Sequence, residues 1–225
     1  MRIQSTRDIS TRNVNIVVYG FPGTGKTTLV RTLNHPLLIS VEGGTLSLAG
    51  EDIAVTEVRT MDEFYEVLAY LKANPTEFGA VALDSFTELA KICLAEEQEK
   101  AANTKNGWEA YGNLSKAMKA ILRALRDLPV DVYVTALCSK DKDQASGVMY
   151  WYPEAPGSQL SNEITALFDE VFFLVNRTGE KGELYRYLQT FNDGQAIAKD
   201  RSGRLEPWEP VDLNAVMNKI RGENR

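Results

Sequence analysis

The stretch VNIVVYGFPGTGKTTLVRTL, residues 14–33, decides the fold. Residues 14–19 are mostly apolar, which is typical of a buried strand, and residues 26–33 are typical of a helix. Between them, residues 20–27 fit the pattern G-x-x-x-x-G-K-[ST] without exception. Glycines let such a loop curl so that its backbone N–H groups point at phosphate oxygens. The stretch predicts a site for a nucleoside triphosphate, and the alternative is a chance glycine-rich turn.

The loop residues have separate expected roles. Lys26 is placed to bridge the β- and γ-phosphates, the Thr27 hydroxyl to hold Mg²⁺, and Thr28 to reach the α-phosphate. We therefore predict ATP and Mg²⁺ as ligands. The residues predicted to bind the nucleotide are Gly20, Pro22, Gly23, Thr24, Gly25, Lys26, Thr27 and Thr28.

Two carboxylates follow apolar runs elsewhere in the chain. Asp84 ends the run in FGAVALDSF and is predicted to hold Mg²⁺ through water, although Asp-Ser is also good helix-capping chemistry. Glu42 follows the run in PLLISVEGG. The carboxyl ends of parallel strands line one crevice, so Glu42 is a candidate to orient the attacking water. The alternative is a solvated glutamate beside a flexible Gly-Gly turn.

Short apolar runs alternate with helical patterns along the chain, which predicts an α/β fold with a mostly parallel sheet flanked by helices. An antiparallel hairpin is predicted near the C-terminus, pairing residues 183–190 with 194–200 across a turn at 192–194. Residues 100–108 and 139–159 read as irregular loops. The strands are predicted at 14–19, 37–41, 80–83, 130–137 and 171–175, and the helices at 26–33, 61–72, 85–100, 108–128 and 212–220.

The bulk composition narrows the function classes. The 225 residues carry a net charge of −6, which gives no global attraction to nucleic acid or an anionic membrane. No apolar run approaches the ~20 residues of a membrane span. We read Cys93 and Cys138 as reduced thiols of a cytoplasmic protein. We expect a single domain over residues 1–225, with a short arm at 1–13.

The order of these motifs resembles the RecA-like P-loop ATPase core. More narrowly, GFPGTGKTTL, VEGG, VALDSFTEL, YGNLSKAMKAILRAL and LFDEVFFL resemble phage-borne RecA-like nucleotide-binding proteins, including Sak-type single-strand annealing proteins. The resemblance covers about residues 14–206 and implies a catalytic role for Glu42. It is unlike the AAA+ arrangement, in which an acid directly follows the Mg²⁺ aspartate, because Ser85 and Phe86 stand there. If the chain is phage-encoded, its location is the host cytoplasm.

The resemblance also implies partners. RecA-like proteins work as rings or filaments with ATP between subunits, where a basic pair from the neighbour completes the site. Lys199 and Arg201 stand in the position of that pair, two apart on an expected strand. They would neutralise charge that builds up on the phosphate. The alternative is a hairpin end that carries solvated charges.

The family's DNA-binding loops correspond to the two irregular segments. Their lysines and aromatic side chains are a chemistry suited to single-stranded DNA. The alternatives are a nearly neutral solvated loop, because Asp141 and Asp143 alternate with the lysines, and aromatic residues that fill the core or an interface. The candidate contacts are Lys105, Trp108, Lys140, Lys142, Tyr150, Trp151 and Tyr152.

We therefore expect a Mg²⁺-dependent ATPase, slow or stimulated by DNA, that acts on single-stranded DNA in annealing, recombination or replication. A single-strand-binding or replication protein is a candidate partner. No glutamine ends the strand before the second loop, so the coupling of ATP to DNA is expected to differ from that of the recombinases. Two alternatives remain at this point: a nucleotide-switched binding module with little hydrolysis, and a P-loop kinase of a small acceptor.

Overall fold

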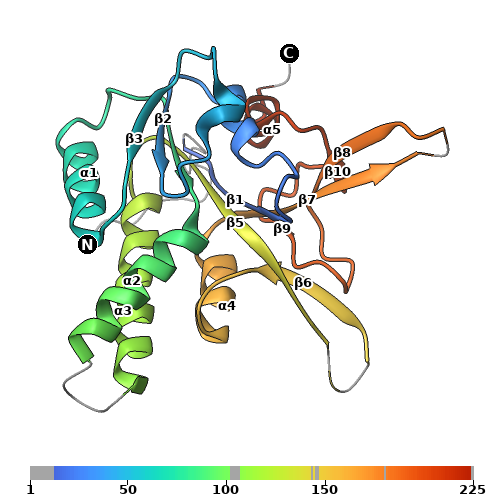
Figure 1. The fold of residues 1–225 in the computed structure, drawn as a ribbon. Coiled ribbons are helices and arrows are strands. Elements are labelled where there is room, and N and C mark those ends of the chain that lie inside the picture. The colour runs from blue at the N-terminus through green and yellow to red at the C-terminus, as the bar shows by residue number, and fades with distance from the viewer. Residues whose placement is uncertain (1–12, 102–106, 143, 145–146, 180, 224–225) are drawn as a thin grey trace, which may run out of the picture.

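The computed structural model of the chain describes residues 13–101, 107–142, 144, 147–179 and 181–223. Within these residues, ten strands form one sheet and helices cover both of its faces (Figure 1). The strands are β1 (Asn15–Gly20), β2 (Pro36–Ser40), β3 (Ala54–Glu57), β4 (Ala80–Asp84), β5 (Asp131–Lys142), β6 (Met149–Pro153), β7 (Glu170–Thr178), β8 (Leu184–Gln189), β9 (Lys199–Asp200) and β10 (Trp208–Glu209). The helices are η2 (Thr27–Thr32), η3 (Thr45–Leu48), α1 (Met61–Ala73), α2 (Phe86–Ala101), α3 (Gly107–Arg126), α4 (Ser158–Leu167) and α5 (Leu213–Arg221).

Six strands form the parallel centre of the sheet, in the order β3-β2-β4-β5-β1-β7. Every residue of β1, β2 and β4 is buried, as expected of strands that are covered on both faces. The carboxyl ends of β1, β2 and β4 therefore meet at one edge of the sheet. The predicted α/β fold class is confirmed.

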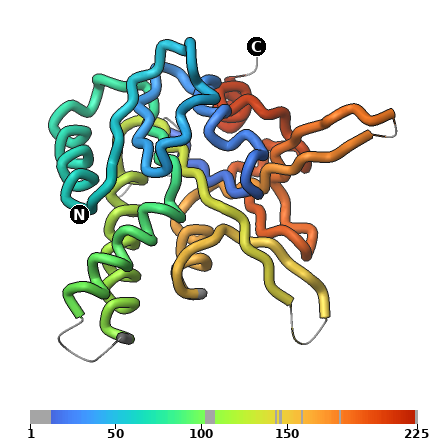
Figure 2. The backbone as a smooth tube through the Cα atoms, in the orientation of Figure 1, coloured from blue at the N-terminus to red at the C-terminus, as the bar shows by residue number. Residues whose placement is uncertain are grey.

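Alternate residues of the strands face two separate cores. Val17 and Val134 pack with the apolar sides of α1, α2, α3 and α4. Val18 and Tyr133 point the other way, into a core shared with η2 and α5. Figure 2 shows α1 to α3, in teal and green, and α5, in dark red, on different sides of the sheet. This packing fixes the positions of the carboxyl ends of the strands, where the predicted phosphate loop, Glu42 and Asp84 lie.

The antiparallel part of the sheet differs from the predicted pairing. Residues 184–189 pair with β7 instead of with 194–200, and β9 also pairs with β7. Residues 192–194 do make a turn. The Asn192 side-chain amide oxygen accepts a hydrogen bond from the Gly194 amide, and the Asp193 carboxylate accepts one from the Gln195 amide. That turn directs the chain to a bridge between Trp151 and Ala196. The hairpin near the C-terminus exists, but its strands are β7 and β8.

Most of the described residues in the segment 139–159 lie in regular elements, where we predicted an irregular loop. β5 continues to Lys142 and pairs with β6, and α4 begins at Ser158. The hairpin of β5 and β6, in yellow, extends away from the sheet (Figure 2). Lys140, Asp141 and Lys142 are exposed on β5, and Pro153 is the one buried residue of β6, so the sequence there lacks the apolar pattern of the buried strands.

The remaining predicted helices agree with the structure to within a few residues, with one difference in type. The segment after the loop is the short 3₁₀ helix η2, not an α-helix. Asp212 caps the last helix, since its carboxylate accepts a hydrogen bond of 3.0 Å from the Ala215 amide. The sequence patterns missed η3 and the largely exposed strand β3. No helix of the described ranges is long and apolar enough to cross a bilayer.

Candidate functional site

The loop after β1 has a conformation that depends on its glycines. A Cβ on Gly20 would lie 3.0 Å from the Thr24 hydroxyl oxygen and 3.1 Å from the Leu174 carbonyl oxygen. Gly23 and Gly25 have φ angles of 76° and 102°, which L side chains rarely adopt. The Thr24 hydroxyl donates a hydrogen bond of 2.8 Å to the Phe21 carbonyl and closes the turn. The loop is therefore a tight bend in which the backbone itself forms the surface.

Lys26 lies inside this bend and is only 8% exposed. Its ammonium group donates to the carbonyl oxygens of Gly20, at 2.8 Å, and Phe21, at 3.0 Å. Burial lowers the pKa of Lys26, while the nearby carboxylates of Asp84 and Glu42 raise it. Anionic oxygens are stronger acceptors than neutral carbonyls. A phosphate group would therefore compete well for this ammonium group.

Asp84 ends β4 and is 4% exposed. Its carboxylate accepts a hydrogen bond of 2.6 Å from the Thr27 hydroxyl and another from the Thr135 hydroxyl. A carboxylate beside a hydroxyl supplies the hard oxygen ligands that Mg²⁺ prefers. The structure thus brings together the two residues that we predicted for the metal. Thr135 was not predicted from the sequence to contact Asp84; it lies on β5, which is placed between β1 and β4.

Glu42 lies next to Asp84 because their strands are neighbours. Ser40 of β2 is in register with Asp84, so the loop that follows β2 passes the end of β4. The Ser85 hydroxyl, itself fully buried, donates a hydrogen bond to the Glu42 carboxylate and accepts one of 3.3 Å from the Glu88 amide. Glu42 is otherwise exposed. The arrangement holds one carboxylate in a fixed direction while leaving it open to water.

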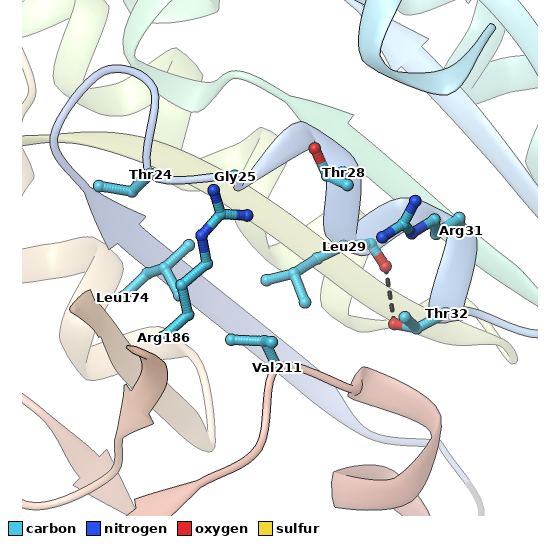
Figure 3. Close-up of a pocket in the computed structure, with 9 residues that line it drawn as sticks. All are labelled: Thr24, Gly25, Thr28, Leu29, Arg31, Thr32, Leu174, Arg186 and Val211. Carbon is cyan, nitrogen blue, oxygen red and sulfur yellow. Dashed lines mark hydrogen bonds between the residues drawn. The ribbon is translucent and has the colours of Figure 1, made fainter. Parts of the chain in front are cut away.

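Two predicted loop residues remain to be placed, Pro22 and Thr28. Pro22 is exposed at the tip of the bend. Thr28 lines a small pocket with Thr24, Gly25 and Arg186 (Figure 3). Arg186 was not among the site residues predicted from the sequence. Its only sequence signal is a cation within the strand pattern LYRYLQ, and that pattern does not show which strand it pairs with.

The predicted basic pair lies far from the loop of its own chain. Lys199 is in register with Val171, which lies at the amino end of β7, whereas the loop follows the carboxyl end of β1. Its ammonium group donates at 2.5 Å to the carbonyls of Thr165 and Phe168 at the end of α4. Burial and the nearby Arg201 lower the pKa of Lys199.

Arg201 is also occupied within the chain, by an ion pair of 2.5 Å with Asp169. The same-chain geometry thus agrees with the alternative interpretation of the basic pair, as charges that serve the local structure. Action on a neighbouring subunit's nucleotide stays a prediction.

The candidate DNA contacts are dispersed. Lys105 lies outside the described residues. Trp108 is 87% exposed at the start of α3. Lys140 and Lys142 are exposed on β5, where their cross-strand neighbours are Trp151 and Met149. The described residues of the two segments thus include exposed cations and one exposed indole ring.

The three consecutive aromatic residues on β6 do not share one face. Trp151 stacks on Phe173 with ring centroids 6.2 Å apart, and its carbonyl accepts a hydrogen bond of 3.1 Å from the Tyr19 hydroxyl. Tyr150 and Tyr152 lie beside each other, with centroids 5.6 Å apart, on the other side of the strand. Trp151 therefore packs against the core, as the alternative interpretation held, and all three aromatic side chains are half-buried.

Comparison with known proteins supplies a family match. A family model described as "AAA domain" matches residues 12–202. No curated protein sequence matches the chain. Among solved structures, a KaiC-like protein of the hyperthermophilic archaeon Pyrococcus horikoshii OT3 is 16% identical, with 78% of this chain and 76% of that chain covered and a TM-score of 0.43. A RadB recombinase is also 16% identical, with 80% and 89% covered and a TM-score of 0.44.

Proposed function

The chain belongs to the AAA domain family, and on that premise we propose that it is a Mg²⁺-dependent ATPase whose active site is the carboxyl edge of the parallel sheet. One observation supports this proposal above the others. The candidate residues lie at the ends of three strands of the sheet: Lys26 and Thr27 follow β1, Glu42 follows β2, and Asp84 ends β4. The Thr27 hydroxyl donates a hydrogen bond to Asp84, and the Ser85 hydroxyl donates one to Glu42. Phosphoryl transfer needs a cationic side chain, a metal ion and a carboxylate that lie close to one another.

The residues present fit a nucleoside triphosphate with Mg²⁺. A side chain at Gly20 would collide with the loop, so the backbone stays free for phosphate oxygens. Thr27 and Asp84 would hold the metal, and the bound ion neutralises charge on the phosphates. Within the described residues, no group of three or more histidine, cysteine or acidic residues is placed to hold a metal ion.

Glu42 would accept the proton of the attacking water. Its exposed carboxylate gives water access, and the Ser85 hydrogen bond fixes its direction. Lys26 would turn from the loop carbonyls to the phosphates, where its charge stabilises the transition state. Ser85 stands where AAA+ proteins carry an acid, and its hydroxyl brings the Glu42 carboxylate to that place from the adjacent strand.

The finer proposal is that ATP turnover drives work on single-stranded DNA, as in annealing, recombination or replication, within a ring or filament. Exposed Trp108, Lys140 and Lys142 support it, because stacking and phosphate contacts need an accessible ring and accessible cations. In an oligomer, Lys199 and Arg201 would leave their internal partners to reach a neighbour's phosphate. The same proposal includes a Sak-type annealing role, a single-strand-binding or replication protein as partner, and a cytoplasmic location.

A second candidate is a nucleotide-switched binding module with little hydrolysis. The internal hydrogen bonds of Lys199 and the ion pair of Arg201 favour it, because these cations then contribute nothing to phosphoryl transfer. Such a module would bind ATP as tightly as the ATPase. The two candidates differ only in turnover and in its response to DNA.

Steady-state ATP turnover with and without a single-stranded oligonucleotide distinguishes them. The DNA proposal predicts stimulation that is lost in Trp108→Ala and in the double variant Lys140→Gln/Lys142→Gln. Lys72→Gln, which removes an exposed cation from α1, serves as the matched control and should keep the stimulation. Slow turnover that is indifferent to DNA would support the module and contradict the DNA proposal.

A further inference from the structure

Arg186 reaches the phosphate loop from a hairpin strand of the same chain. β7 lies beside β1, and β8 lies beside β7, with Arg186 in register with Asn176. Its guanidinium group extends across Leu174 toward Gly25 (Figure 3). A Cβ on Gly25 would lie 3.1 Å from the Arg186 Nη1 atom and 3.7 Å from its Cζ atom. The cation is thus in contact range of the bend that we propose for the phosphates.

The pocket beneath this contact has a chemistry suited to an anion. Its lining includes two guanidinium groups, those of Arg31 and Arg186, and three threonine side chains, but no carboxylate. The other lining residues are Gly25 and three apolar residues. The pocket thus presents cations and hydroxyl groups with no internal counter-charge. The threonines are Thr24, Thr28 and Thr32.

Arg186 also has no competing partner among the residues that the structure describes. It makes neither an ion pair nor a side-chain hydrogen bond there. By contrast, Arg201 pairs with Asp169, and Arg204 donates to the Ile220 carbonyl at 2.6 Å. An exposed arginine that is held against a glycine of the loop and remains unpaired is available to a ligand.

We infer that Arg186 is a cation of the nucleotide site supplied by the same chain, and that it binds the α-phosphate. The pocket includes Thr28 but neither Lys26 nor Asp84, so it lies on the side of the loop away from the groups proposed for the γ-phosphate and the metal. The planar guanidinium fork matches two phosphate oxygens at once. This inference rests on the proposed function and adds a nucleotide contact that needs no neighbouring subunit.

Equilibrium binding of ATP and ADP to the full chain tests the inference. Arg186→Ala should weaken both nucleotides by the same factor, about 10- to 50-fold, because both carry the α-phosphate and one charge-assisted contact is lost. Arg186→Lys keeps the charge but loses the planar fork, so it should recover only part of the affinity. Lys181→Ala, which removes an exposed cation from the same hairpin, is the matched control and should bind as the wild type does.

The outcomes separate the inference from the proposed function. Wild-type protein that binds neither nucleotide would contradict both. If the wild-type protein binds both nucleotides and Arg186→Ala binds ATP and ADP with affinities within twofold of the wild-type values, the inference about Arg186 is overturned and the proposed function is not. A loss confined to ATP also overturns it, because the contact would then be to the γ-phosphate. Arg186→Gln keeps the side-chain length and supplies the same comparison if the alanine variant folds poorly.

Discussion

Glu42→Gln should separate nucleotide binding from hydrolysis. Glutamine keeps the size of the side chain and an oxygen that can accept the Ser85 hydrogen bond. Glu42 is exposed, so the free energy of unfolding should change by less than about 0.5 kcal/mol. The amide cannot take a proton from water. Loss of a general base costs about 10²- to 10⁴-fold in rate, which corresponds to roughly 3–5 kcal/mol in the activation barrier.

Single-turnover release of phosphate from Mg-ATP measures this loss, and a binding titration in parallel shows whether the nucleotide affinity is kept. Glu51→Gln is the matched control, because it neutralises another exposed loop glutamate without touching the site. Ser85→Ala should lower turnover less, by about 10-fold, since it removes only the hydrogen bond that positions Glu42. Turnover by Glu42→Gln within threefold of the wild-type rate would refute the assignment of Glu42 as the base.

Other substitutions test separate parts of the account. Lys26→Ala should abolish ATP binding in calorimetry, and wild-type affinity in that variant would rule out the phosphate-loop assignment. Burial, with the nearby Asp200 carboxylate, raises the pKa of Glu170 from 4.5 to about 8, so the folded protein holds a proton that the unfolded chain releases. The thermal stability of the wild-type protein should therefore fall as the pH rises from 5 to 8, and Glu170→Gln should remove this pH dependence. The same pH dependence in both proteins would contradict the prediction. A Lys199→Ala/Arg201→Ala protein mixed with Lys26→Ala protein should regain some ATPase activity if the basic pair acts across an interface, and no recovery would count against that role.

The residues that lie close to their strand ends could be predicted from the sequence. The loop at 20–27, Asp84 and Glu42 each follow a buried parallel strand, and parallel strands present their carboxyl ends at one edge. The local sequence pattern and the geometry of a parallel sheet were enough to predict that these residues lie at the same edge. The direct contact of Glu42 with the residue after Asp84 depends in addition on β2 and β4 being neighbours.

The parts that depend on pairing between distant segments were beyond the sequence patterns. β8 pairs with β7 rather than with the segment after it, and this pairing alone delivers Arg186 to Gly25. Thr135 reaches Asp84 because β5 inserts between β4 and β1. Trp151 and its two tyrosine neighbours separate because the strand alternates its side chains. Each depends on a strand neighbour or strand conformation that local composition does not reveal.

The most direct test of the central claim is a crystal structure of the chain with Mg²⁺ and a non-hydrolysable ATP analogue. The account predicts phosphate oxygens against the backbone amides of residues 23–27, with the metal between Thr27 and Asp84. A nucleotide bound elsewhere, or an empty loop at saturating nucleotide, would contradict it.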